Sequence, residues 1–203
     1  MLSSWTLREL LRRTKSHHAD ADLVQLQLLG RVDTLESYRK HLTKLYGFQR
    51  PLQSFFTTSP ELSSSGLVHP MRLVALRDDL LALGVSPAAL TSMRSCTVTL
   101  AGADFARTLG WFFVVERMSL LSTLIVRKLK RRLSSELFES STTYMASCSS
   151  QSGTRWVQLG TLLDRRAARS DLLDRVEAGA HEAFDCQRSW FGSFRTLATA
   201  QAC

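Results

Sequence analysis

The stretch that most constrains the fold is LGWFFVVERMSLLSTLIVRKL, residues 109–129, the most apolar part of the chain, with the charged pair Glu116–Arg117 in its middle. Its apolar part is close to the shortest length that crosses a bilayer, and a charge at the centre of a membrane span costs about 3 kcal/mol. The basic run at 127–132 suits the solvent-exposed end of a helix. We therefore predict a buried central helix over residues 104–133 of a soluble, cytoplasmic protein, and no membrane span.

The composition favours an all-α fold. Glycine and proline are scarce, at 10 and 4 of 203 residues, whereas leucine, alanine and arginine are abundant. A chain of this length buries the core of one domain, so we expect a single multihelical domain over 1–195 and a flexible C-terminal tail over 196–203. The four cysteines lack the spacing of a structural zinc site and are expected to be reduced thiols.

The formal net charge of +8 leaves several interpretations open. Solvated helix faces explain it without any function. An anionic ligand, an acidic protein partner or nucleic acid would each explain it through binding. Nucleic acid is the least favoured of these, because the arginines are spread along the chain and only 127–132 is a concentrated basic run.

Hydrophobic periodicity and capping residues predict the remaining elements. In chain order they are an amphipathic helix from residue 5, a second apolar segment ending near 29, a helix capped by Thr34, a loop at 59–70, a helix ending at Gly84, a connector with short helical turns at 85–102, a polar interruption at 141–154, and a last helix capped by Ser170.

Five segments, in order and in register, resemble the bacterial biliverdin-producing heme oxygenase family, and together they span nearly the whole chain. They are LRRTKSHHADAD, YRKHLTKLYGFQRPLQ, the stretch 109–129, SQSGTRWVQLGTLLD and HEAFDCQRSWF. The resemblance implies a heme oxygenase-like fold, with heme as both substrate and cofactor. It also implies cleavage of heme, with O2 and reductant, to biliverdin, CO and iron, and an acidic electron donor such as a ferredoxin or a reductase.

The resemblance implies that His18 is the proximal heme ligand, because Thr14 precedes it by the four residues that separate a threonine from the ligating histidine in that family. A neutral imidazole suits this role. On a helix, His17 points about 100° away from His18, so only one of the two can face a given pocket. Without the resemblance, either histidine would be interpreted as structural or exposed.

The chain departs from the family where the resemblance implies a distal helix. Arg117 replaces the family's first glycine, and Leu121 and Ser122 replace its glycine pair. Arg117 and Leu121 share a helix face, and glycine lets a backbone lie against a flat ligand. Two large side chains there would exclude heme, force a sixth ligand or leave a shifted pocket. A small rotation of the helix would instead present Ser119 and Ser122.

The resemblance assigns three arginines to the surroundings of heme. Arg155 remains from the family's Arg-Trp-Arg sequence, and Arg127 matches its basic position after the glycines; both would face propionates. Arg117 has two interpretations. It is a cation for a propionate or another anionic ligand, or it forms an ion pair with a carboxylate, such as one from the helix after Thr34.

Three functions stay open on the sequence. The first, which the surviving proximal pattern at Thr14 and His18 favours, is a heme oxygenase. The second is a degenerate protein of the same fold that has lost oxygenase activity and acts as a binding, sensor or interaction protein, as the replaced glycines suggest. The third is a basic interaction protein that uses 127–132.

Overall fold

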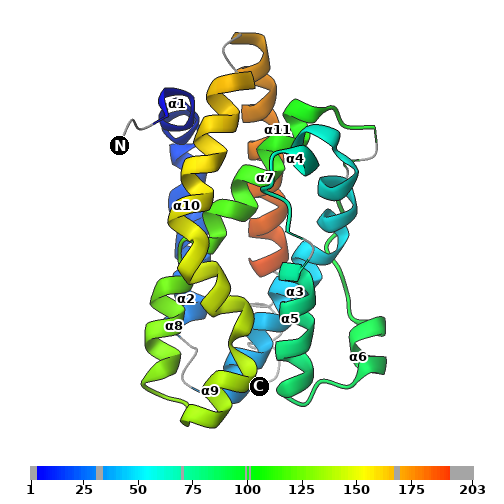
Figure 1. Ribbon diagram of the computed structural model, residues 1–203, viewed down its shortest axis with the longest axis vertical. Helices are drawn as coiled ribbons and strands as arrows, with labels where there is room; N and C mark the ends of the chain where they lie inside the picture. Colours follow the sequence, from blue (N-terminus) through cyan, green and yellow to red (C-terminus); the bar gives the residue numbers. More distant parts are fainter. Residues whose placement is uncertain are drawn as a thin grey trace, which may run out of the picture.

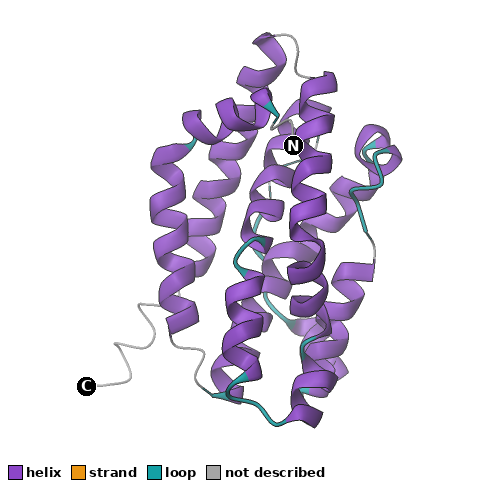
Figure 2. Ribbon diagram, turned by 60° about the vertical axis from the view of Figure 1, so that its left-hand side comes forward, coloured by secondary structure: helices purple, strands orange, loops and turns teal. Residues whose placement is uncertain are grey.

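The computed structural model describes residues 4–30, 34–69, 71–98, 100, 102–166 and 170–192, and for 24–30 and 170 it describes the backbone alone. Helices joined by short loops make up this part of the chain, which has no strand (Figure 1, Figure 2). They are α1 (Trp5–Arg13), α2 (Lys15–Gly30), α3 (Leu35–Thr58), α4 (Pro60–Ser64), α5 (Met71–Ala82), α6 (Pro87–Ser92), α7 (Phe105–Ser119), α8 (Ser122–Lys130), α9 (Ser135–Ser141), α10 (Thr143–Arg166) and α11 (Ser170–Gly192). The prediction of an all-α fold is confirmed. The predicted tail at 196–203 lies outside the described residues.

Helix α7 is the centre of the bundle and lies against α11 along its length (Figure 1). The two backbones approach closely because each helix has a glycine at the crossing. A Cβ atom on Gly110 would overlap the backbone of Val176 and Ala180, and one on Gly179 would overlap the backbone of Arg107. The close approach leaves a core of large aromatic side chains, with Phe113 and Phe184 fully buried.

The predicted uninterrupted helix over 104–133 is wrong. Helix α7 ends at Ser119 and α8 begins at Ser122, after a turn at Leu120 and Leu121. The N–H of Leu120 donates to the carbonyl of Arg117, so the helix tightens from i−4 to i−3 bonding there. The hydroxyl of Ser119 also donates to the carbonyl of Glu116 at 2.6 Å, a local bond that favours bending.

The predicted polar interruption within or between helices at 141–154 is limited to one residue. Only Thr142 separates α9 from α10, and α10 then runs through the polar stretch without a break. The buried carboxylate of Asp79, on α5, explains where α10 begins. It accepts the N–H groups of Thr143 and Tyr144 at 3.0 and 2.9 Å, which satisfies two of the donors that a helix N-terminus leaves open.

The predictions for the loops hold in part. Residues 59–70 contain the short helix α4, which begins at Pro60, before the chain leaves helical structure. The connector at 85–102 carries the short helix α6, as expected. Gly84 follows α5 with a positive φ of 83°, a conformation that glycine adopts without strain. Thr34 caps α3 through a capping box with Ser37, as predicted.

The apolar stretch lies mostly inside the bundle. The segment Phe105–Lys130 is long and apolar enough to cross a membrane, with a mean hydropathy of 1.6 over its most apolar window. In the folded chain, 67% of that window is buried against the other helices. The core helix of a soluble protein has the same combination of hydropathy and burial.

Candidate functional site

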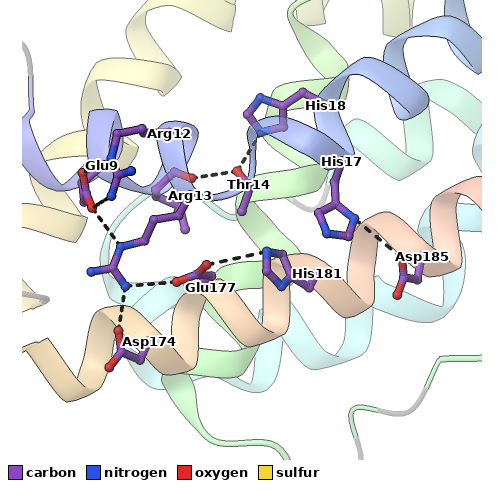
Figure 3. Close-up of polar contacts among 11 residues, drawn as sticks. Glu9, Arg12, Arg13, Thr14, His17, His18, Asp174, Glu177, His181 and Asp185 are labelled. Atoms are coloured by element: carbon purple, nitrogen blue, oxygen red, sulfur yellow. Dashed lines mark hydrogen bonds and ion pairs between the residues drawn. The ribbon is translucent and has the colours of Figure 1, made fainter.

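Of the residues that the resemblance assigns to heme, His18 lies on α2 and Arg117 on α7, and the others lie on later elements. His18 sits on the first turns of α2, and its Nε2 atom is 2.7 Å from the hydroxyl of Thr14 (Figure 3). Thr14 donates its single hydroxyl hydrogen to the carbonyl of Leu10, also at 2.7 Å. The Thr14 oxygen must therefore accept from His18, so Nε2 carries the proton and Nδ1 carries the lone pair.

His18 is neutral in this environment. Burial, together with the positive charge of Arg117, lowers the pKa of His18 to about 4. Its ring packs near Phe113 and Phe184, with centroid separations of 6.3 and 5.2 Å. An uncharged imidazole between aromatic rings is the form that a metal ligand requires.

His17 points away from His18, as its place on the helix predicts (Figure 3). It stacks on His181 of α11 with ring centroids 4.4 Å apart. Its Nδ1 atom lies 3.7 Å from a carboxylate oxygen of Asp185. Burial is the main cause that lowers the pKa of His17. His17 therefore belongs to the contact between α2 and α11.

Arg117 forms a bidentate ion pair with Asp22. Its two terminal nitrogens lie 2.7 and 2.6 Å from the two carboxylate oxygens, and its guanidinium carbon lies 5.9 Å from the centroid of the Phe184 ring. Of the two interpretations of Arg117, the ion pair is the one present, but its carboxylate comes from α2 and not from α3. Asp22 lies one helical turn after His18.

Leu121 and Ser122 occupy the turn between α7 and α8 and its exit. Leu121 is partly buried and packs against the core. Ser122 is buried and, with Ser119, lines a small cavity beside His41 of α3. The two serines predicted as a close-approach pair therefore lie together, but they face His41.

Arg155 points into a different part of the core. Its Nε and Nη2 atoms donate to the two carboxylate oxygens of Glu116 at 2.9 and 2.6 Å, and Nη2 also donates to the carbonyl of Leu67. Arg72 of α5 donates to the same carboxylate at 2.6 Å. Arg155 is therefore engaged with Glu116 and does not extend toward His18.

Arg127 lies on α8, on the molecular surface. It lines a groove with Leu124, Lys128, Arg131 and Arg132. Leu124, which lines the groove with these basic side chains, is 51% exposed. The concentrated charge predicted at 127–132 is thus a surface feature, separate from the surroundings of His18.

The residues present do not fit a heme between α2 and α7 in this conformation. The Nε2 atom of His18 carries a proton that it donates to Thr14. The Arg117–Asp22 pair joins the two helices that would lie on opposite faces of the porphyrin. Within the described ranges, no group of three or more His, Cys, Asp or Glu side chains is arranged to hold a metal ion.

No protein-family model matches the chain, and no curated protein matches it. The case for a family therefore consists of the five sequence segments alone.

Several site residues were absent from the sequence predictions. Asp22 carried a usable signal, since it follows His18 by four residues and so shares its helix face. Arg72 and Gln53 carried no such signal. The packing of α5 brings Arg72 to the carboxylate of Glu116, and the packing of α3 brings Gln53 to the neighbouring cavity. His41 looked like one polar position in an amphipathic helix, yet it is 4% exposed.

Proposed function

We propose that this chain is a degenerate protein of the heme oxygenase type that has lost oxygenase activity and acts as a binding or interaction protein in the cytoplasm. The observation that carries the proposal is the Arg117–Asp22 ion pair, at 2.6 and 2.7 Å. Arg117 stands where the resemblance implies a glycine, and its side chain fills the space that glycine would leave to a porphyrin.

Opening that space would separate two charges that are largely withdrawn from solvent. The Arg117 side chain is 15% exposed and that of Asp22 is 34% exposed. Breaking a partly buried pair leaves each charge without its partner, which is strongly unfavourable. Leu121, in the turn that follows α7, packs against the core and adds bulk that a glycine would not.

The surface that remains available is the basic end of α8. Arg127, Lys128, Arg131 and Arg132 line one groove together with the exposed Leu124. An apolar side chain next to several cations suits an acidic protein partner better than nucleic acid or a membrane, because it offers a small apolar anchor with charge complementarity.

The second candidate function is heme oxygenase activity at His18, yielding biliverdin, CO and iron with an acidic electron donor. One observation favours it. His18 is neutral and partly buried between Phe113 and Phe184, and a rotation of its ring would free a nitrogen for iron. This candidate requires the Arg117–Asp22 pair to open.

A hemin titration followed by absorbance separates the two candidates. We expect the unmodified protein to show no saturable one-to-one Soret band. The double variant Arg117→Gly, Leu121→Gly should gain a Soret band, and His18→Ala in that background should change or abolish it. A matched control is Arg107→Gly, since Arg107 is also an α7 arginine in an ion pair, with Glu182 on α11.

Two results would overturn the proposal. A one-to-one Soret band in the unmodified protein that decays to biliverdin with ascorbate in air would establish the oxygenase. Equal hemin binding by the double variant and the unmodified protein would show that Arg117 and Leu121 do not close the site.

A further inference from the structure

A second polar site lies in the core beside α7, away from His18. Side chains from α3, α5, α7 and α10 enclose a cavity of about 30 Å³. Its polar lining is Gln49, Gln53, Arg72, Glu116 and Arg155, and His69 lies at its exposed rim. A cavity of this size holds one or two waters or an ion of a few atoms.

The charges around this cavity do not balance. Glu116 is the one carboxylate among its lining residues, and it faces two guanidinium groups. The side chains of Arg72, Arg155 and Glu116 are 11%, 7% and 2% exposed. The cluster therefore holds one net positive charge in the interior, where an uncompensated charge is costly.

The hydrogen-bonding groups of the cavity are also unbalanced, because one donor has no partner. Glu116 uses both oxygens on the two arginines. The second terminal nitrogen of Arg72 donates to the sulfur of Cys148 at 3.0 Å. The Nε2 atom of Gln53 is buried in the cavity wall and has no hydrogen-bond partner. The cavity thus combines an unpartnered donor with positive charge, which an anion would satisfy.

We propose that this cavity binds one small monovalent anion, a halide or a planar oxyanion such as nitrate or formate. The anion accepts from Nε2 of Gln53 and is attracted by the guanidinium groups of Arg72 and Arg155. Its single charge cancels the net charge of the cluster. A divalent sulfate or phosphate is too large for the space and would leave one negative charge in excess.

The cavity is coupled to the fold through its lining. Arg155 also holds the carbonyl of Leu67, and Glu116 belongs to the last turns of α7 before the bend. A bound anion would draw α3, α5 and α10 onto α7. Anion binding should therefore appear as a rise in stability that saturates with concentration.

The test is the midpoint of thermal unfolding, titrated with sodium chloride, nitrate, formate or sulfate over the same range of ionic strength. We expect saturable rises with the three monovalent anions and no saturable rise with sulfate. Gln53→Leu, which removes the donor at similar volume, should weaken the apparent affinity at least tenfold. Gln158→Leu, an exposed glutamine on α10, is the matched control and should leave it unchanged.

Three results would overturn the inference. They are a rise that is linear in salt, a rise that is largest with sulfate, or equal responses of Gln53→Leu, Gln158→Leu and the unmodified protein. The first two need no variant, so the inference stays testable even if Gln53→Leu does not fold. The outcome is independent of hemin binding, because the cavity shares no residue with the His18 surroundings.

Discussion

His41 makes the protein sensitive to mild acid. It lies on α3, is 4% exposed, and neither ring nitrogen has a hydrogen-bond partner in the described part of the structure. Burial, with a smaller contribution from the charge of Lys44, lowers the pKa of His41 from 6.5 to about 4. The folded protein therefore keeps His41 neutral in a range of pH in which the unfolded chain protonates it.

The size of the effect follows from that difference. Below pH 6.5 the unfolded state binds a proton that the folded state does not, so the free energy of unfolding falls as the pH falls, until the folded pKa near 4 is reached. Each pH unit within this window is worth about 1.4 kcal/mol. Between pH 7 and pH 5, His41 alone should remove about 2 kcal/mol of stability.

The assay is urea unfolding at pH 7 and pH 5 for the unmodified protein and for His41→Leu. The variant should lose about 2 kcal/mol less between the two pH values. It should be at least as stable at pH 7, since it removes buried nitrogens that have no partner. The other histidines are the same in both proteins, so the difference isolates His41. His69→Leu, at an exposed position in the loop before α5, is the control.

The same loss of stability in His41→Leu and the unmodified protein would refute the reasoning. It would mean that His41 is solvated or partnered in solution and titrates alike in the folded and unfolded states. A difference that His69→Leu reproduces would be equally damaging, since it would trace the effect to net charge.

Three further predictions concern the packing and the thiols. Gly110→Ala should cost about 3 kcal/mol in urea unfolding, because the new Cβ meets the α11 backbone, whereas Gly153→Ala, with open space around it, should be neutral or stabilising. Asp79→Ala should cost about 1–3 kcal/mol in the same assay by exposing the N–H groups at the start of α10; no loss would mean that water replaces the cap. The thiols of Cys96 and Cys186 donate to the carbonyls of Phe48 and Thr97, and the interaction with Cys96 lowers the pKa of Cys186, so diamide should join the two in an intramolecular disulfide. Peptide mapping that finds Cys186 free after diamide would contradict this.

The helical class and most helices could be predicted from periodicity and caps, because those signals are local. Thr34 and Gly84 mark helix ends through bonds to near neighbours. The start of α10 could not be predicted, since its cap, Asp79, comes from α5, 64 residues away in sequence. A polar segment became helical because a distant carboxylate satisfied its N-terminus.

For the candidate site, the sequence indicated which residues need a partner but not which residues provide it. The need of Arg117 for an anionic partner follows from its place in an apolar helix, but the choice of Asp22 depends on how α2 lies against the bundle. The resemblance alone assigned Arg155 to a heme propionate. Arg155 pairs with Glu116 instead, because α7 and α10 bring the two side chains together. Gln53 and His41 are recognisable only once burial is known.

The adjacent charges of Glu116 and Arg117 fix the rotation of α7. Consecutive residues on a helix point about 100° apart, so the carboxylate meets Arg72 and Arg155 while the guanidinium meets Asp22. Rotating the helix by one position would place like charges together in either sense, with Glu116 against Asp22 in one direction and Arg117 against the two arginines in the other. The order of two charged residues in an otherwise apolar segment thus fixes the rotation of the central helix about its axis. Hydrophobic packing alone would discriminate poorly between rotations.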